Sequence, residues 1–135
     1  MQVAEHPVHI RASLFGLARR LAAARATAAD IAELRAAVDQ LENAPLDDYY
    51  PGNVALHRAL VSLSGNPRLV ELYDNVSKEL HLFRRHGLEP ASARHTSNDQ
   101  HREIIACLEA GSDEAGRLME AHILAGKNRM LAEHD

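Results

Sequence analysis

Apolar residues recur at intervals of three and four along nearly the whole of this chain, and no segment alternates apolar and polar residues one by one. Intervals of three and four gather side chains on one face of an α-helix, whereas strict alternation is typical of a half-buried β-strand. Clusters that contain proline or glycine interrupt the pattern at several points, and such clusters mark turns between helices. The sequence therefore predicts an all-α helical bundle.

These interruptions divide the chain into six expected helices. The segment Thr27-Ala28-Ala29-Asp30 resembles a capping box at the start of the second helix, and Asn66-Pro67 is a start signal for the fourth. The segment Ser97-Asn98-Asp99-Gln100 has the capping-box pattern too and is expected to start the fifth. The helices are expected at about residues 8–26, 27–43, 53–64, 67–87, 97–109 and 113–131, with loops at 44–52 and 88–96.

The expected helices have apolar stripes that we expect to face the core. In the first helix the stripe consists of Ile10, Leu14, Leu17, Ala18 and Leu21. In the second helix it consists of Ile31, Leu34, Val38 and Leu41. In the sixth helix it consists of Ala115, Leu118, Met119 and Ile123.

The length and the charge of the chain limit what it can do alone. Its 135 residues, of which 46% are hydrophobic, are enough for one domain with a real core. Fifteen Lys and Arg against nineteen Asp and Glu give a formal net charge of −4, whereas a nucleic-acid-binding surface normally needs an excess of positive charge. These values argue against direct nucleic-acid binding by this chain.

Cysteine content and hydropathy indicate the compartment. Cys107 is the only cysteine, so no disulfide can form within the chain, and a reducing compartment is the natural interpretation. The chain has no run of about 18 uncharged apolar residues that could span a membrane, and its first residues lack the features of a signal peptide. We therefore expect a cytoplasmic protein without a membrane segment.

Nine histidines are many for a domain of this size, and three of them lie on the apolar sides of three different helices. These three are His57, His101 and His122. Each has apolar residues three or four positions away, which places its imidazole on the inward-facing side of its helix. Asn53 lies one helical turn before His57 and is expected to point the same way.

Three buried imidazoles each need a polar partner, because burying an unpaired polar group costs free energy. One metal ion could serve all three, since neutral imidazole is a common ligand of zinc, nickel, copper and iron. The alternative is that each histidine forms a separate hydrogen bond with a carbonyl or a carboxylate. Periodicity alone does not decide between these two hypotheses.

Arg84 and Tyr73 lie on the apolar stripe of the expected fourth helix. A guanidinium that reaches the interior from this position could hold a carboxylate through two parallel hydrogen bonds. The alternatives are a solvent-exposed arginine at a helix end and a tyrosine that only packs in the core. Both residues are our candidates for contacting a small-molecule effector.

Four short motifs, in this order and spacing, resemble one known family. They are Asn53-Val54-Ala55-Leu56-His57, Ser64-Gly65-Asn66-Pro67, Gln100-His101-Arg102-Glu103-Ile104-Ile105 and Met119-Glu120-Ala121-His122. Over residues 10–131 the chain is similar to the FadR-like C-terminal domain, FCD, of GntR-family transcriptional regulators. The resemblance implies an antiparallel bundle of six to seven helices that encloses a cavity for a ligand and a metal.

The resemblance also implies a set of metal ligands. Many members of this family bind a divalent metal through an Asp-x-x-x-His pair and two later histidines, and the metal receives a small effector that is often a carboxylate. Carried over position by position, these ligands are Asn53, His57, His101 and His122. Asn53 replaces the usual aspartate, so the fourth ligand is an amide oxygen without negative charge. Zinc is the expected ion, with nickel or manganese as alternatives.

The function implied is that of a non-enzymatic effector-binding and dimerisation domain of a bacterial transcription regulator. The family's N-terminal winged helix-turn-helix is not found in this sequence, so we expect one domain over residues 1–135 and a homodimer that contacts DNA only through another domain. The alternatives are a mononuclear metal-dependent hydrolase and a metal-free helical adaptor. A ferritin-like di-iron bundle is disfavoured, because Asn98 and Met119 stand where its Glu-x-x-His pairs need glutamates.

Overall fold

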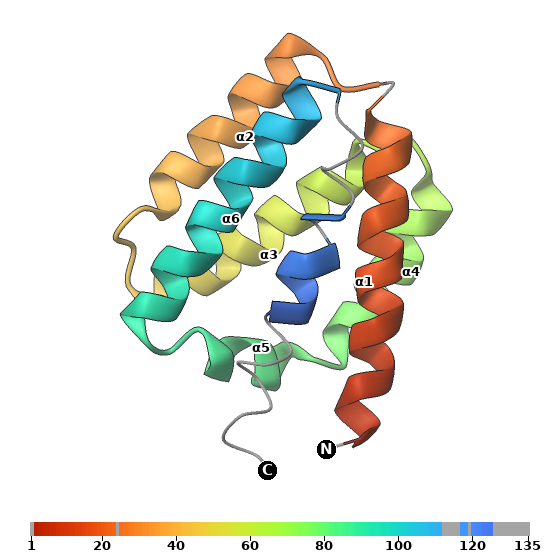
Figure 1. Cartoon of the computed structure of the whole chain (residues 1–135). Helices are drawn as coiled ribbons and strands as arrows, with labels where there is room; N and C mark the ends of the chain where they lie inside the picture. Colours follow the sequence, from red (N-terminus) through yellow and green to blue (C-terminus); the bar gives the residue numbers. More distant parts are fainter. Residues whose placement is uncertain (1, 24, 112–116, 119, 126–135) are drawn as a thin grey trace.

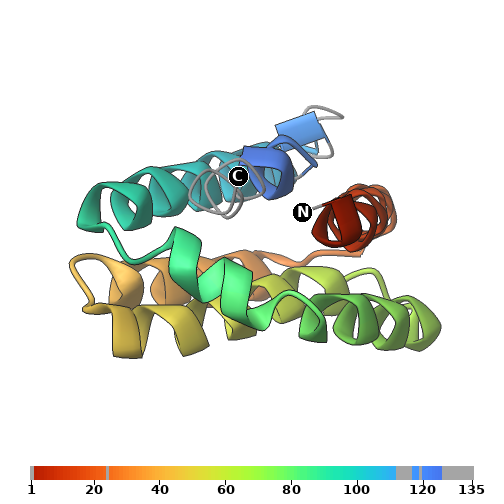
Figure 2. The ribbon, with the colours of Figure 1, turned by 90° about the horizontal axis from the view of Figure 1, so that it is seen from below.

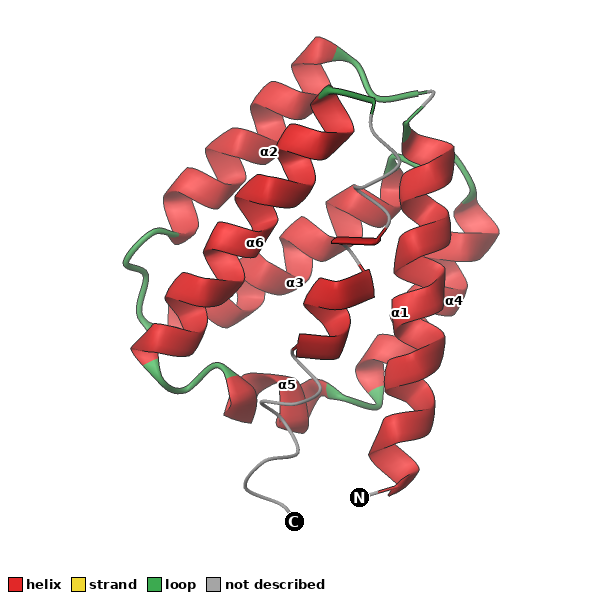
Figure 3. Cartoon of the chain, viewed as in Figure 1, coloured by secondary structure: helices red, strands yellow, loops and turns green. Residues whose placement is uncertain are grey.

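The computed structural model describes residues 2–23, 25–111, 117–118 and 120–125, with side chains from residue 6 onward. Within these residues all the regular structure is helical, and no strand is present (Figure 3). The helices are α1 (Gln2–Ala22), α2 (Ala28–Leu41), α3 (Leu46–Ser62), α4 (Pro67–Lys78), α5 (His81–Gly87) and α6 (Ala91–Glu109). Residues 117–118 and 120–125 are helical as well. The all-α prediction is confirmed.

The helices form two layers that pack face to face (Figure 2). One layer contains α2, α3 and α4, and the other contains α1, α6 and, between these two, residues 120–125 (Figures 1 and 2). The long helices run in alternating directions, so the bundle is antiparallel (Figure 1). Between the layers, α1 packs against α3 and α4, and α6 packs against α2. Side chains from both layers meet in the interior.

The start and the buried side of α2 are as the sequence predicts. The Thr27 hydroxyl accepts a hydrogen bond from the Asp30 N–H at 3.1 Å, and the Asp30 carboxylate accepts one from the Thr27 N–H at 2.9 Å. This reciprocal pair is a complete capping box. All four residues of the expected stripe are buried: Ile31, Leu34, Val38 and Leu41.

The buried face of α1 is not the face that the sequence predicts. Ile10, Leu17 and Leu21 have exposed fractions of 53%, 37% and 37%, and Leu14 is only half-buried. Ala18 is the one member of the expected stripe that is buried. The buried hydrophobic and charged side chains of α1 are Val8, Arg11, Ala12, Phe15, Ala18, Arg19 and Ala22.

Small side chains explain why α1 is turned this way. The buried face carries three alanines and Gly16, and small residues let a neighbouring segment approach closely. The carboxylate of Glu120 lies in the space that a Cβ atom on Gly16 would fill. Because α1 has an apolar stripe on each of two sides, periodicity alone does not show which side is buried. Close packing favours burial of the side with the smaller residues.

α3 begins earlier than expected, and most of the loop predicted at residues 44–52 is helical. The helix starts at Leu46, directly after Pro45, and continues through Pro51. Pro51 lies in the second turn, where its missing N–H removes only the hydrogen bond to the carbonyl of residue 47. The added turn buries Tyr49, whose exposed fraction is 1%. This tertiary contact outweighs the local preference of residues that precede proline for extended backbone.

The expected fourth helix is divided into α4 and α5. α4 begins at the predicted start, where the Asn66 side chain accepts a hydrogen bond from the Leu69 N–H at 3.1 Å. It ends at Lys78, and α5 follows a short link in which Leu80 is fully buried. α5 lies across one end of the bundle (Figure 1). The burial of Leu80 anchors this change of direction in the core.

α6 begins at Ala91 rather than at the predicted start near residue 97. Ser97, expected to cap the helix, and Asn98, expected in its first turn, are buried within it. The Asn98 amide nitrogen donates a hydrogen bond to the Val38 carbonyl of α2 at 3.2 Å. A side chain expected near the start of a helix therefore connects two helices.

The expected sixth helix is described only in part. Leu118 is half-buried and Ile123 is buried, as the expected stripe requires. Ala115, Met119 and residues 126–131 lie outside the described residues. None of the described helices is long and apolar enough to cross a lipid bilayer.

Candidate metal centre

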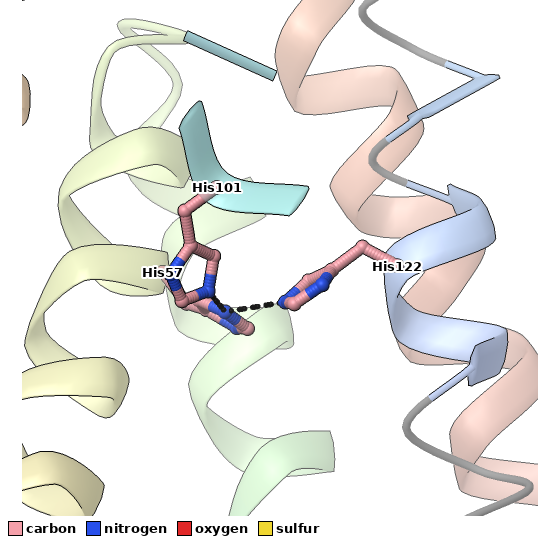
Figure 4. Close-up of side chains that lie close together, drawn as sticks. All are labelled: His57, His101 and His122. Atoms are coloured by element: carbon pink, nitrogen blue, oxygen red, sulfur yellow. Dashed lines mark hydrogen bonds between the residues drawn. The ribbon is translucent and has the colours of Figure 1, made fainter. Parts of the chain in front are cut away.

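Three imidazoles from three helical segments meet in the interior of the bundle (Figure 4). His57 comes from α3, His101 from α6 and His122 from residues 120–125, and their exposed fractions are 3%, 0% and 4%. The Nε2 atom of His57 lies 3.1 Å from Nε2 of His101 and 3.0 Å from Nε2 of His122. The three rings thus point their Nε2 atoms at one shared point.

Apolar neighbours along each helix hold the three histidines inward. His57 is flanked by the buried Leu56 and Leu60, and His101 lies one turn before the buried Ile104. Because residues three and four apart share a helix face, burying these neighbours also buries the imidazoles. The inward position that the sequence predicts for the three histidines is confirmed.

The outer nitrogens of two of the rings face amide oxygens. Nδ1 of His101 lies 3.2 Å from Oδ1 of Asn98, and Nδ1 of His122 lies 2.7 Å from Oε1 of Gln100. The orientation of the Asn98 amide is fixed, because its nitrogen donates to the Val38 carbonyl and, at 3.1 Å, to the Glu42 carboxylate. Each Nδ1–H group therefore donates a hydrogen bond to an amide oxygen.

This arrangement determines what these two rings offer to the centre. A neutral imidazole that is protonated on Nδ1 has a lone pair on Nε2. His101 and His122 thus present lone pairs to the shared point. A hydrogen bond from the outer ring nitrogen to an amide or carboxylate oxygen is also the usual support of a metal-bound histidine.

The outer nitrogen of His57 faces a cation instead. A guanidinium NH2 of Arg11 lies 3.0 Å from Nδ1 of His57, and the Tyr73 hydroxyl lies 3.4 Å from the same atom. Arg11 also donates from Nε to the Ser77 hydroxyl at 3.1 Å, and its guanidinium lies 5.3 Å from the centre of the Tyr73 ring. Arg11 therefore connects α1 to α3 and α4 beside the histidine cluster.

Burial keeps His57 neutral. Desolvation lowers the pKa of His57 well below 6.5, and repulsion from His122, His101, Arg11 and Arg84 lowers it further, in that order. Neutral imidazole is the form that binds a metal. Desolvation likewise lowers the pKa of Arg11 to about 10, so its guanidinium stays charged at neutral pH.

Asn53 lies one turn before His57 on α3, and its exposed fraction is 3%. Its Oδ1 atom is buried and has no hydrogen-bond partner within the described part of the chain. A buried amide oxygen without a partner costs free energy. The atom is thus available as an oxygen ligand, one helical turn before His57.

Two of the three distances between the Nε2 atoms suit one shared ion. With metal–nitrogen bonds of about 2.0–2.1 Å, two imidazole nitrogens on one ion lie about 2.9 Å apart at a right angle and about 3.4 Å apart at the tetrahedral angle. The two Nε2–Nε2 distances to His57, 3.1 and 3.0 Å, fall between these values. The three histidines could therefore hold a divalent metal ion.

The two candidate effector contacts are both buried. Arg84 has an exposed fraction of 6% and Tyr73 one of 2%. An NH2 group of Arg84 has no hydrogen-bond partner among the described residues, and its guanidinium lies 5.7 Å from the centre of the Tyr50 ring. The Tyr73 ring is stacked on Phe15 at 5.7 Å, and Phe15 is in turn stacked on His57 at 5.2 Å. Both candidates thus belong to the interior around the histidines.

Sequence reasoning missed three residues of this site. Arg11 is buried although it lies outside the apolar stripe predicted for α1, and the sequence places Asn98 only within a capping-box pattern. Gln100 belongs to the motif around His101, but nothing in its spacing indicates a contact with His122. In the sequence, Arg11 stands out only by its position between the two apolar stripes of α1.

Comparison with known families gives a match whose residue range includes this site. A family model described as the FCD domain matches residues 8–125, a range that includes all the residues of the cluster. No curated protein matches the chain. Since the family match covers most of the sequence, this protein belongs to the FCD family, the C-terminal effector-binding domains of GntR-family transcription regulators.

Proposed function

We propose that this domain senses a small carboxylate-type metabolite through a divalent metal ion, as part of a FadR-subfamily regulator. The proposed metal ligands are His57, His101, His122 and the amide oxygen of Asn53. Zinc is the proposed ion, with nickel or manganese as alternatives, because imidazole nitrogen suits zinc and nickel and an amide oxygen suits manganese. The proposal depends above all on one observation, the convergence of three Nε2 atoms on one buried point.

Two buried guanidinium groups support an anionic effector. Arg11 and Arg84 have exposed fractions of 4% and 6%, and no carboxylate in the described part of the chain contacts either of them. Each also repels the other, since the charge of Arg84 helps to lower the pKa of Arg11. Buried charges are normally paired, so an anion that binds between them would relieve a real cost.

The charge of the metal ligands supports the same class of effector. Three neutral imidazoles and one amide leave the full double charge of a divalent ion in place. A carboxylate could then bind the ion with one oxygen and a guanidinium with the other. Tyr73, whose ring lies beside Arg11, is the proposed hydroxyl contact.

The proposed activity is regulatory rather than catalytic. Among the described residues, the cluster of possible metal ligands consists of three histidines and contains no carboxylate to act as a general base. We propose a cytoplasmic homodimer in which effector binding favours one arrangement of the helices, and a separate domain contacts DNA.

Metal titration of the purified protein tests the proposal. After treatment with EDTA and dialysis, the protein is titrated with Zn²⁺, Ni²⁺ and Mn²⁺ by calorimetry, and its melting temperature is measured with and without acetate or succinate. We expect one ion to bind per chain and to raise the melting temperature, and a carboxylate to raise it further only when the ion is present.

The His57→Ala variant should lose this response to metal, and the His9→Ala variant, changed at an exposed histidine of α1, should keep it. Absence of metal binding by the unchanged protein would contradict the proposal. Equal metal binding by both variants would contradict the assignment of His57 as a ligand.

A further inference from the structure

We infer that the groove between α2 and α3, on the outer surface of the domain, binds a basic amphipathic helix of a partner protein. This groove lies outside the candidate metal centre, and binding there requires neither a metal ion nor an effector. Its position, its apolar floor and its charge together indicate this kind of partner.

The groove is a surface hollow of about 640 Å³, and all the residues that line it lie between Asp30 and Leu63. α2 and α3 pack side by side in one layer of the bundle (Figure 2). On α3, the groove is lined by Gly52, Ala55 and Ala59, which lie on the opposite side of the helix from His57. The groove and the histidine cluster are therefore separate sites on two sides of one helix.

The floor of the groove is apolar. It is formed by Leu34 and Leu41 of α2 and Leu56 of α3. Ala55 and Ala59 are exposed beside this floor, and their small side chains leave the groove open. A partner can therefore bring apolar side chains close to both helices.

The length of the groove and the chemistry of its lining favour a helix as the partner. The lining extends from Asp30 to Leu41 on α2 and from Asp48 to Ser62 on α3, which corresponds to about 17–21 Å of helix. An extended peptide would find few backbone partners there, because N–H and C=O groups inside a helix are already bonded within it. An amphipathic helix satisfies its own backbone and can place apolar side chains in such a groove at intervals of three and four.

The charge of the groove favours a basic partner. Its lining includes the carboxylates of Asp30, Glu33 and Asp48, and no lysine, arginine or histidine is among the lining residues. Asp30 accepts the hydrogen bond of the capping box, whereas Glu33 and Asp48 are exposed and have no ion pair within the described residues. Because α3 runs back along α2 after the link at 42–45, Glu33 and Asp48 lie towards opposite ends of the groove. An apolar helix face with a cation near each end would complement this arrangement.

Fluorescence anisotropy of a labelled peptide tests the inference on metal-free protein. The probe is a helical peptide of about 16 residues, with leucines at intervals of three and four on one face and lysines at the edges of that face. A second peptide has glutamate in place of each lysine. We expect the lysine peptide to bind, and the glutamate peptide to bind at least about tenfold more weakly. Absence of binding by the lysine peptide, or equal binding of the two peptides, would overturn the inference.

Charge reversal shows whether the peptide binds in this groove. The double variant Glu33→Lys/Asp48→Lys should bind the lysine peptide at least about tenfold more weakly and should gain affinity for the glutamate peptide. The matched control is Asp99→Lys/Glu103→Lys, which changes the net charge equally at two exposed positions of α6. This control should bind the lysine peptide like the unchanged protein. An equal loss of affinity in both double variants would mean that only net charge matters and would overturn the inference.

A neutral pair of variants tests the apolar part of the groove. Ala55→Gln/Ala59→Gln fills the groove with polar side chains and should weaken binding of the lysine peptide by about tenfold. Ala32→Gln/Ala36→Gln, at two exposed positions of α2 that do not line the groove, should leave binding unchanged. Equal affinities of these two double variants would contradict docking on the apolar floor.

Sedimentation velocity distinguishes a separate partner from a second copy of the chain. We expect the unchanged protein and Glu33→Lys/Asp48→Lys to have the same oligomeric state. If the variant loses a dimer that the unchanged protein forms, the groove is an interface between copies, and the inference is overturned. Since every measurement uses metal-free protein, a missing response to metal would contradict the proposed function and leave this inference standing.

Discussion

The two sides of the histidine cluster are built from different chemistry. On the α6 side, amide oxygens face the outer nitrogens of His101 and His122, at 3.2 and 2.7 Å. On the α1 side, the guanidinium of Arg11 faces the outer nitrogen of His57, at 3.0 Å. Hydrogen-bond acceptors thus face the outer nitrogens of the first two rings, and a donor faces the outer nitrogen of the third. The two sides of the cluster therefore offer opposite hydrogen-bonding groups to the rings.

The same contrast continues outward from the rings. On the α6 side, Asn98 donates to Glu42, which also accepts from Arg102 at 3.0 Å. These two hydrogen bonds, that from Arg102 first, lower the pKa of Glu42. On the α1 side, no carboxylate among the described residues contacts the buried guanidinium of Arg11. Glu42 thus has its cationic partner within the protein, whereas we propose an anionic ligand as the partner of Arg11.

The largest expected effect tests the α1 side through Phe15, which is fully buried and stacked on His57 and Tyr73. Phe15→Ala should lower the free energy of unfolding by about 3–5 kcal/mol, because it leaves a cavity beside both rings. Leu17→Ala, on the exposed side of the same helix, should change it by less than about 1 kcal/mol. Urea denaturation measures both. A larger loss from Leu17→Ala would mean that α1 is turned the other way.

The second effect tests the α6 side. Asn98→Ala removes the acceptor of the His101 N–H and should weaken Zn²⁺ binding by about 10–100-fold, the range found for such supporting residues. Asp99→Ala, at the exposed neighbouring position, should leave the affinity unchanged. Calorimetric titration of the metal-free variants compares them. If both variants bind as tightly as the unchanged protein, the amide does not prepare His101 for the metal.

Sequence alone could predict the three histidines, because their apolar neighbours recur at helical spacing and burial follows from that pattern. It could also predict α2, whose start is fixed by a local hydrogen-bond pair between Thr27 and Asp30. Both features depend on residues within one or two turns of each other. Interactions between residues this close in the sequence can be recognised from the local sequence pattern.

Partners from distant segments could not be predicted in this way. Arg11 meets His57 across 46 positions of the chain, and Asn98 meets Val38 across 60. Which face of α1 is buried depends on close packing against Glu120 and not on α1 itself. The partners of the histidines therefore needed the structure, whereas the inward position of the histidines did not.

The third effect concerns pH. Burial lowers the pKa of His57 in the folded protein well below 6.5, whereas the unfolded chain takes up this proton near pH 6.5. Below that pH the unfolded state binds more protons, so the free energy of unfolding should fall by up to about 1.4 kcal/mol per pH unit, and it should be insensitive to this group above about pH 7.5. Urea denaturation of metal-free protein between pH 8 and pH 5 measures the slope.

His57→Gln isolates the contribution of this ring. The variant should lose part of the pH dependence, because the remaining histidines titrate in both proteins. Identical slopes for the variant and the unchanged protein would mean that His57 does not resist protonation in the folded state.

The smallest effect is expected at the outer end of the α6 side. Arg102 donates to Asp39 at 2.8 Å and to Glu42 at 3.0 Å, but all three side chains are exposed, and exposed ion pairs contribute little. Arg102→Ala should therefore change Zn²⁺ affinity by less than about threefold, and the small change should shrink further in high salt. The reason is that Asn98 keeps its bond to the Val38 carbonyl and so keeps its oxygen directed at His101. If Arg102→Ala weakens Zn²⁺ binding as much as Asn98→Ala does, the exposed Arg102 is needed to orient His101. The buried hydrogen bonds of the α6 side would then not be enough to hold this ring in place.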